Sequence, residues 1–341
     1  MRAVEAQDSP TLSVGCPRGA SLEAIQLPVR KKLDGVSQAM ESIVASELPL
    51  VGQVSAHLLA MRGKMFRPTL LLLSSEVAGK PEPQAVTLAA SLELIHLATL
   101  VHDDAVDHSA LRRGMPTVNA LFGHQISVIM GDFLYSTALT HLVGLGDLEA
   151  LHALTRASTE MALGEMRQLA VTEPLRFSER EYYELIRSKT ASLMGTACEL
   201  GALSGAREFR DALGNYGENL GMAFQITDDL MDYREVKETT GKPSRLDLRE
   251  HKVTLPLIHA LREMSPAARK QVERLFEREA MEDDDIASVV GIVAESGGFE
   301  YARERCEEFA ESAEEALSRV PDSAARRSLS ASISYVMERH S

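Results

Sequence analysis

The sequence predicts an all-α protein with one large helical domain. From about residue 21 onward, Ala, Leu, Met, Glu and Arg dominate, and no sustained polar and apolar alternation indicates strands. Of the 341 residues, 45% are hydrophobic and 25% are charged, as in an ordinary globular chain with a sizeable core. No Ser/Gly-rich linker divides the chain, so we expect a single domain over residues 21–341. Residues 1–20 lack the apolar stretch of a signal peptide and are expected to form a loose tail.

The composition excludes several classes of function. The formal net charge of −14 argues against a broad basic surface for nucleic acid or anionic lipid. The cysteines Cys16, Cys198 and Cys306 have no metal-like spacing, which favours a reducing cytoplasm. No run approaches the roughly 20 apolar residues of a spanning helix, so no transmembrane segment is expected.

Local signals place several helices in order along the chain. The run PTLLLLSSEVAG from Pro68 is typical of a buried core helix. Ser178 followed by Glu181 predicts a capped helix start, and Ser265 before Pro266 predicts another. Breaks are expected near Gly63, Gly79 to Pro83, Gly114 to Pro116, Gly144 to Gly146, Pro174, Gly241 to Pro243, and Pro321.

Two similar acidic segments, HDDAVD and TDDLMD, each end an apolar helical run. Residues four apart share a helix face, so Asp103 points with Asp107, and Asp228 points with Asp232. Paired carboxylates repel unless a cation neutralises them, and hard oxygen ligands suit Mg²⁺. If both helices face one cavity, the sequence predicts a magnesium and diphosphate site.

The neighbours of these aspartates strengthen the prediction. His96 lies two turns before Asp103, and Gln225 lies three residues before Asp228, so polar groups line the same stripes. The acidic run Glu282 to Asp285 is a contrast, because it has no evident basic partners and precedes an apolar run. We interpret that run as the first turn of a helix, where the helix dipole favours acidic residues.

Cationic residues recur at the predicted breaks and helix ends. A substrate with a diphosphate would need metal ions on one side and Arg or Lys on the other. The candidates are Lys64, Arg67, Arg112, Arg113, Lys189 beside Thr190, Lys242, Arg249 and Lys252.

From about residue 28 to its end, the chain resembles the trans-polyprenyl diphosphate synthases, the head-to-tail isoprenoid chain elongases. The ordered motifs are GKMFRP, LIHLATLVHDDAVDHSALRRGMPTVNALFG, VIMGDFLYS, KTASL, GMAFQITDDLMDY, TTGKP and DLREHKVTLPL. The resemblance implies a helical bundle around a central cavity, of the isoprenoid synthase type, in a cytoplasmic homodimer. It also implies three Mg²⁺ ions in the substrate complex, isopentenyl diphosphate, and geranyl or farnesyl diphosphate as the allylic substrate.

The same resemblance implies a role for each site residue. The Mg²⁺ ligands would be Asp103, Asp107 and Asp228, supported by Asp104, Asp229 and Asp232. The allylic diphosphate would be held by Arg112, Lys189 and Lys242, with Lys252 also at the substrate. Isopentenyl diphosphate would be held by Lys64, Arg67, His96 and Arg113. Thr190 and Gln225 would offer oxygen dipoles to an allylic cation that forms when diphosphate leaves.

Product length is expected to depend on the residues one helical turn before Asp103. In the family, aromatic residues at Ala98 and Thr99 stop the chain at farnesyl length, and neither is aromatic here. We therefore expect products of geranylgeranyl length or longer, in a tunnel lined by residues such as Ile95, and favour a long quinone-type tail. Three positions depart from the family pattern: Arg62 and Met65 replace a Gly and an Arg in the first motif, and His251 replaces a Gly.

Other interpretations of the same residues remain. A terpene cyclase also ionises allylic diphosphates, but it would not need the four residues assigned to isopentenyl diphosphate. A non-catalytic subunit of a heteromeric synthase would be expected to have lost its aspartates, and both clusters are intact. A helical scaffold with acidic patches would not need an ordered series of motifs.

Overall fold

The computed structural model describes residues 21–61, 63–234, 246–278 and 280–338. Lys242, Arg62 and Cys16 lie outside these ranges. The elements are α1 (Leu22–Gln26), η1 (Leu27–Val29), α2 (Arg30–Ile43), α3 (Pro49–Ala60), α4 (Phe66–Glu76), α5 (Gln84–Val106), β1 (Leu111–Arg112), β2 (Met115–Pro116), α6 (Val118–Phe122), α7 (His124–Leu145), α8 (Leu148–Leu169), η2 (Pro174–Arg176), α9 (Glu179–Ile186), η3 (Arg187–Ala191), α10 (Ser192–Leu203), η4 (Arg207–Phe209), α11 (Arg210–Arg234), α13 (Leu246–Arg249), α14 (Leu255–Glu263), α15 (Pro266–Phe276), α16 (Asp283–Glu295), α17 (Gly298–Ser318) and α18 (Ala324–Met337).

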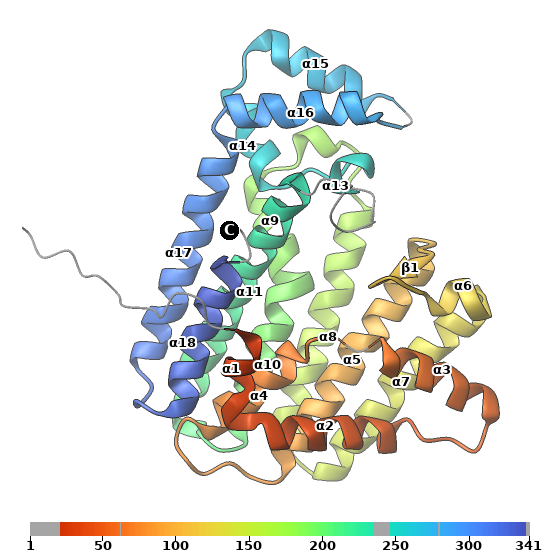
Figure 1. Ribbon diagram of the computed structural model, residues 1–341, viewed down its shortest axis with the longest axis vertical. Helices are drawn as coiled ribbons and strands as arrows, with labels where there is room; N and C mark the ends of the chain where they lie inside the picture. The colour runs from red at the N-terminus through yellow and green to blue at the C-terminus, as the bar shows by residue number, and fades with distance from the viewer. Residues whose placement is uncertain (1–20, 62, 235–245, 279, 339–341) are drawn as a thin grey trace, which may run out of the picture.

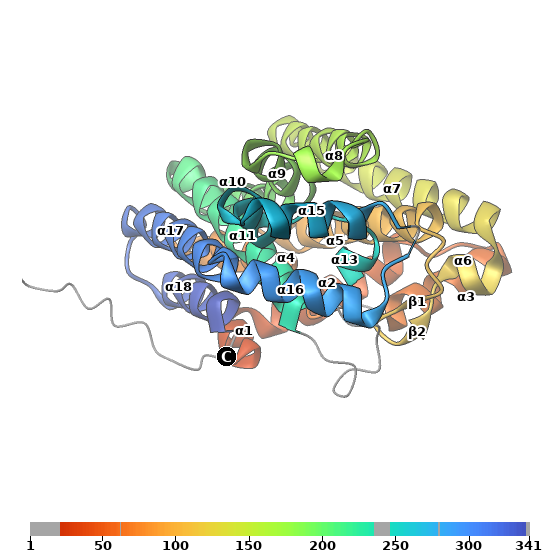
Figure 2. The same cartoon turned by 90° about the horizontal axis from the view of Figure 1, so that it is seen from above.

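The all-α prediction is confirmed, and the long helices surround a buried centre. Figure 1 shows α5, α8, α11 and α17 running along the long axis, with α15 and α16 across one end and α2 across the other. Every residue of α10 is buried, and it packs against α4, α8 and α11. The view from above in Figure 2 shows α10 and α11 between α8 on one side and α17 on the other. The predicted core helix from Pro68 is α4, which is buried from Pro68 to Ser75.

Small residues let α11 approach the preceding helix closely. A Cβ atom on Gly217 would lie 2.5 Å from the carbonyl oxygen of Met194, and one on Gly221 would lie 2.5 Å from the Cα of Ala191. Only glycine, which has no Cβ atom, permits this contact. Glycine lowers the helix propensity of α11, but it lets the two backbones come together. The close approach sets the second half of α11 against η3.

The predicted helix starts are confirmed. Ser178 and Glu181 form a capping box at α9, and Ser265 caps α15 with Pro266 at its first position. The run Glu282 to Asp285 does open α16, as predicted. The expectation that it has no basic partners is wrong, because Arg249 pairs with Asp283 and Arg278 with Asp285. These arginines are distant in sequence or lie across a turn, so spacing did not reveal them.

A small hairpin follows α5, where the sequence indicated only a break. β1 and β2 pair antiparallel, with Leu111 opposite Pro116. Arg113 and Gly114 form the two-residue turn with φ angles of 53° and 75°. Two successive positive φ angles are the mark of a type I′ hairpin turn. Both arginines line a small pocket together with His96, although Arg112 donates to Asp104 and Arg113 donates to the carbonyl of Met61.

By length and composition, two helices are long and apolar enough to cross a membrane, although the sequence analysis predicts no transmembrane segment. They are α5, whose apolar window is 61% buried, and α7, whose window is 33% buried. α5 is a core helix that carries charged residues at its end. α7 therefore has the more exposed apolar surface of the two.

Candidate active site

The first aspartate cluster lies at the end of α5. Asp103 is half-buried, and Asp107 is the exposed residue that ends the helix. Asp104 is turned away from them and is only 4% exposed. Arg112 from β1 donates to both of its carboxylate oxygens, with Nε at 2.9 Å from each and Nη2 at 2.8 Å from Oδ1. The hairpin thus fixes Arg112 beside the cluster.

The second cluster lies near the end of α11, where Asp228 and Asp232 are half-buried. The backbone N–H of Asp247 donates to Oδ2 of Asp232 at 3.1 Å. Asp229 is 5% exposed, and burial together with the charge of Asp247 raises its pKa to about 8. Asp247 has a pKa raised to about 6, first by burial and then by the charge of Asp232. Asp247 is therefore a further carboxylate beside this cluster, and the sequence prediction omitted it.

Lys189 of η3 contacts two side chains of α8. Its Nζ lies 2.6 Å from Glu165 and donates to Oε1 of Gln168 at 2.8 Å. The pKa of Asp103 is raised to about 6, mainly by burial and then by Glu165, while Lys189 and Arg112 oppose the shift. Asp103 is thus close enough to Lys189 for the two charges to interact.

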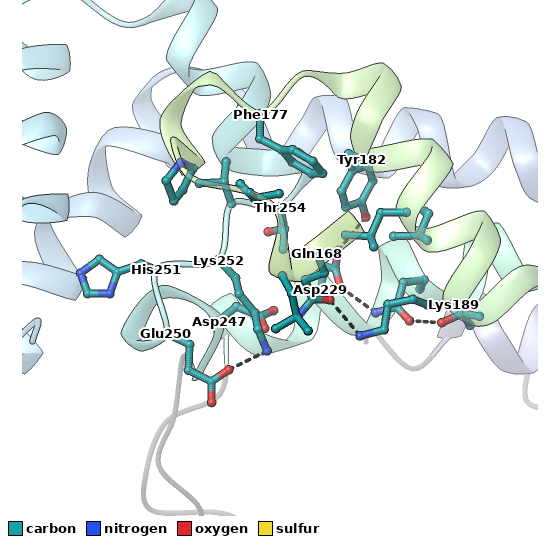
Figure 3. A pocket seen from close by; sticks show the side chains of 18 residues that line it. Gln168, Phe177, Tyr182, Lys189, Asp229, Asp247, Glu250, His251, Lys252 and Thr254 are labelled. Carbon is teal, nitrogen blue, oxygen red and sulfur yellow. Dashed lines mark hydrogen bonds and ion pairs between the residues drawn. The ribbon is translucent and has the colours of Figure 1, made fainter. Parts of the chain in front are cut away.

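The main pocket has a volume of about 390 Å³ and lies between α8, α9, η3, α11 and the segment after α13. Figure 3 shows Tyr182, Lys189, Asp229 and Lys252 around it. Lys252 pairs with Glu250 at 2.6 Å. Burial lowers the pKa of Lys252, but Glu250, Asp247 and Asp107 outweigh this effect and raise it overall. The charge of Asp107 therefore affects the pKa of Lys252, which lines the pocket. Thr190 and Gln225 also line it.

A second group of basic side chains lies around His96 of α5 and Arg67 of α4. Nη1 of Arg67 donates to Nε2 of His96 at 3.0 Å. Burial and the nearby charge of Arg67 lower the pKa of His96 well below its ordinary value, so the imidazole is neutral and its Nε2 can accept. Burial lowers the pKa of Arg67, whereas Glu93 and Asp228 raise it. Arg67 thus lies within electrostatic reach of the second aspartate cluster.

The remaining residues of this corner are held by the backbone and by α18. Nη1 of Arg113 donates to the carbonyl of Met61 at 3.0 Å, and its guanidinium occupies the space that a Cβ on Gly63 would fill. Lys64 is exposed and donates to the hydroxyl of Tyr335 at 3.0 Å. The structure therefore brings Lys64, Arg67, His96 and Arg113 to one corner.

The proposed chain-length residues lie on α5 and are not among the residues that line the main pocket. Ala98 is 1% exposed, and Thr99 is half-buried with its hydroxyl donating to the carbonyl of His96 at 2.7 Å. Neither lines the main pocket. Their effect on product length stays a prediction.

Two departures from the family pattern occupy unusual backbone positions. Met65 has φ of 52° and His251 has φ of 55°, both in the left-handed region that favours glycine. The trans-polyprenyl diphosphate synthases have glycine at the position of His251. The positive φ angle there explains why glycine is favoured. The ring of His251 packs edge-on against Phe276, with centroids 5.5 Å apart.

The aspartates fit Mg²⁺ when the ion is shared with a substrate. Within residues 21–338, apart from the undescribed positions, no three acidic, His or Cys side chains are gathered closely enough to hold an ion alone. Mg²⁺ usually takes one or two carboxylates together with phosphate oxygens and water. Paired carboxylates near Lys and Arg match that donor set.

Several residues of the site were not predicted from the sequence. Glu93 is a buried acid three residues before His96, Glu165 and Gln168 lie one turn apart on α8, and Asp247 opens the motif DLREHK. A charged residue inside an apolar helical run was a signal for Glu93. No signal in the sequence indicated Tyr182. Its hydroxyl donates to Asp229, which lies 47 positions away.

Solved structures and sequences resemble this chain along almost all of its length. A decaprenyl diphosphate synthase from Rhodobacter capsulatus superposes with a TM-score of 0.89 and 34% identity, covering 94% of this chain and all (100%) of the other. A polyprenyl synthase from Caulobacter crescentus CB15, complexed with calcium and isoprenyl diphosphate, gives 0.88 and 33%, covering 95% and 99%. Octaprenyl diphosphate synthase of Escherichia coli K12 is 36% identical over 315 residues, which are 91% of this chain and 96% of the relative.

The helical fold, shared with solved polyprenyl and decaprenyl diphosphate synthases, is that of the helical isoprenoid synthase class. Within that class, the sequence model described as Polyprenyl synthetase matches residues 48–293. The chain belongs to the polyprenyl synthetase family and is a prenyltransferase.

Proposed function

We propose that this prenyltransferase condenses isopentenyl diphosphate head to tail with an allylic diphosphate to make a trans-polyprenyl diphosphate of geranylgeranyl length or longer. The relatives are named octaprenyl and decaprenyl diphosphate synthases, which supports a long product. The observation that carries the proposal is that cations lie beside both clusters: Arg112 pairs with Asp104 at 2.8 Å, and Lys252 lines the pocket with Asp229. We propose that the cations beside the first cluster hold one diphosphate and that those around His96 hold the other.

The allylic diphosphate is proposed to lie between the clusters. Members of this family depend on Mg²⁺, and we propose three ions, held by Asp103 and Asp107 on one side and by Asp228 and Asp232 on the other. When bound, the ions would neutralise negative charge on the leaving diphosphate. Lys189 would turn from Glu165 and Gln168 toward the diphosphate, with Arg112 held in place by Asp104. Lys242 and Lys252 complete this proposed set.

The reaction breaks the allylic C–O bond, and its electron pair leaves with the diphosphate. The double bond of isopentenyl diphosphate then supplies the electrons of the new carbon–carbon bond. A proton leaves the adjacent carbon of that unit for the departed diphosphate, which restores a double bond. Thr190 and Gln225 line the pocket and would offer oxygen dipoles to the transient cation.

Isopentenyl diphosphate is proposed to bind at the corner formed by Lys64, Arg67, His96 and Arg113. Neutral His96 accepts from Arg67 through Nε2, so its Nδ1 carries the proton and can donate. Together with two guanidinium groups, this gives a set of hydrogen-bond donors for the second diphosphate.

The wider organisation is also a proposal. We propose one domain over residues 21–341, supported by a single cluster of buried side chains that extends from Ile25 to Val336. We propose a cytoplasmic enzyme with geranyl or farnesyl diphosphate as primer and with no nucleic acid partner. The enzymes of this family are soluble.

We also propose a homodimer formed through α7. This helix is apolar but largely exposed, with Ile129 at 66% and Val143 at 62% exposure. Exposed Leu121 on α6 and Leu148 at the start of α8 extend the same apolar surface. A second copy of α7 would bury it.

Incubation with labelled isopentenyl diphosphate, farnesyl diphosphate and Mg²⁺ tests the function. We expect extended products that disappear with a chelator and in Asp228→Asn. Asp284→Asn is the matched control, since Asp284 is an exposed aspartate in the first turn of α16. Full activity in Asp228→Asn would contradict the assignment of the second cluster.

A further inference from the structure

A continuous chain of hydrogen bonds joins three elements in the wall of the main pocket. The hydroxyl of Tyr182 on α9 donates to Oδ2 of Asp229 at 2.6 Å. Nε2 of Gln225 donates to Oδ1 of the same carboxylate at 2.9 Å. The hydroxyl of Thr190 in η3 donates to Oε1 of Gln225 at 2.8 Å. The hydrogen bonds therefore fix the orientation of each side chain in this series.

Asp229 differs in its surroundings from the other aspartates of its cluster. Successive helical residues are turned by about 100°, so the second position of DDxxD lies off the face shared by the first and last. Asp229 is 5% exposed, and each of its oxygens already accepts from a protein donor. Metal coordination by Asp229 would therefore compete with the hydrogen bonds from Tyr182 and Gln225. Asp104, the equivalent residue of the first cluster, is likewise buried and engaged, in its case by Arg112.

The carboxylate of Asp229 decides which end of the Gln225 amide faces Thr190. When Asp229 is ionised, as a nearby Mg²⁺ would favour, its carboxylate only accepts, so it holds the amide nitrogen of Gln225 and leaves the carbonyl oxygen beside the Thr190 hydroxyl. An amide in the opposite orientation would present its two hydrogens there. These atoms line the pocket in which an allylic cation would form, so the orientation sets the sign of the dipole in that wall.

We propose that Asp229 is a positioning residue and not a metal ligand, and that Tyr182 acts through it to keep the oxygen of Gln225 toward the reacting centre. This rests on the proposed prenyl transfer. Tyr182 lines the pocket but is only 2% exposed, and its hydroxyl is engaged by Asp229. The metal ligands of this cluster are then Asp228 and Asp232 alone.

Asp229→Asn tests the proposal because asparagine supplies one acceptor and one donor. With its oxygen toward Tyr182, its NH₂ group would face the NH₂ group of Gln225, so the Gln225 amide would turn over. We expect kcat to fall by at least about tenfold, as for a lost dipole at a developing charge. The affinity for Mg²⁺ should stay within about twofold, since no ligand is lost.

Calorimetric titration with Mg²⁺, at saturating concentration of a non-reactive thiolodiphosphate analogue of the allylic substrate, measures that affinity without turnover. We expect Asp228→Asn to weaken it by about tenfold or more and Asp229→Asn to leave it near wild type. Equal weakening in both variants would overturn the positioning role. Unchanged affinity in Asp228→Asn would instead contradict the proposed metal site, so the two failures are distinguishable.

Tyr182→Phe provides a second variant with the ring retained. We expect a lower kcat with unchanged KM values and unchanged Mg²⁺ affinity. Tyr183→Phe is the matched control, because the neighbouring hydroxyl donates to Glu179 at 3.0 Å and not to the cluster. A wild-type kcat in Tyr182→Phe, or the same loss in Tyr183→Phe, would overturn the role of Tyr182.

Discussion

Arg67 is a guanidinium in a buried position beside another cation. Burial lowers its pKa, and the nearby charge of Arg113 lowers it further, while Glu93 and Asp228 oppose these effects. Its Nε has no hydrogen-bond partner among the described residues. An anion that enters this corner would therefore supply charge and acceptors that the protein itself does not fully provide.

Arg67→Ala should separate the two substrates kinetically. If Arg67 holds isopentenyl diphosphate, the KM for that substrate should rise by about tenfold or more, with the KM for the allylic diphosphate within about twofold. Steady-state kinetics with each substrate varied in turn measures both constants. Arg303→Ala, at an exposed position on α17, is the control. Equal increases for both substrates would show that the two corners are misassigned.

His96 should contribute to the pH dependence of stability. Its pKa lies well below 6.5 in the folded protein, because burial and Arg67 oppose its charge, whereas the unfolded chain regains the ordinary value. Below pH 6.5 the unfolded state then binds the extra proton, so stability falls as the pH falls. At about pH 5.5 the loss from this residue is about 1.4 kcal/mol.

Urea unfolding at several pH values measures this effect. His96→Gln should lose less stability than the wild type between about pH 7 and 5.5, by about 1 kcal/mol. His152→Gln, at an exposed site on α8, should follow the wild type. Parallel curves for the wild type and His96→Gln would contradict a neutral His96.

At the scale of elements, η3 is a π-helical turn between α9 and α10. It packs against α8 at Gly164, where a Cβ would lie 2.9 Å from Cβ of Ser188 and 3.1 Å from Cγ of Lys189. The position of Lys189 thus depends on the absence of a side chain on the facing helix. π-Helical turns occur often at functional sites.

Gly164→Ala should move Lys189 and destabilise the protein by about 1 to 3 kcal/mol through overpacking. The KM for the allylic diphosphate should also rise. Thermal unfolding and steady-state kinetics measure the two effects. Gly291→Ala on α16 is the matched control, since nothing lies within 4 Å of its added Cβ. The control should gain up to about 1 kcal/mol from helix propensity. A gain in both variants would show that η3 adapts freely.

Ala98→Phe and Thr99→Phe should shorten the product. Ala98 is 1% exposed, so a ring added there must occupy space inside the bundle. Chromatography of the dephosphorylated products measures chain length. Thr87→Phe, nearer the start of α5, is a control for adding a ring elsewhere on the same helix. Farnesyl diphosphate as the sole wild-type product, or no shortening in either variant, would contradict the predicted tunnel.

Elements with a strong local pattern could be predicted from the sequence. Ser178 and Ser265 carry their own capping signals, and the apolar run of α4 needs no distant partner for its interpretation. The hairpin could not be predicted, because its strands have only two residues each. Its turn also places the non-glycine residue Arg113 in the left-handed region, which composition does not reveal.

At the scale of the whole molecule, the apolar surface of α7 has the clearest unmet requirement for burial. Ile129→Glu should convert the proposed dimer to a monomer, because a carboxylate in an apolar interface is strongly disfavoured. Sedimentation velocity measures the change. Leu27→Glu, at another exposed apolar position of 68% exposure, should leave the dimer intact. A monomeric wild type would contradict the proposed assembly.

The site as a whole could be predicted only in part. The carboxylate pairs and most cations follow from residue type and helical spacing. Which aspartate faces the cavity and which faces the protein depends on contacts between distant segments. Tyr182 with Asp229 and Arg112 with Asp104 are such contacts, and no spacing rule links their members.

The π-helical turn makes the site sensitive to the length of the chain as well as to its composition. A π turn holds one residue more than an α-helical turn over the same stretch. A chain lacking one residue between α9 and α10 could still form both helices. Lys189 and Thr190 would then be turned by about 100° relative to α10. A single in-frame deletion could therefore remove the activity while every residue type of the site, and almost the whole fold, is retained.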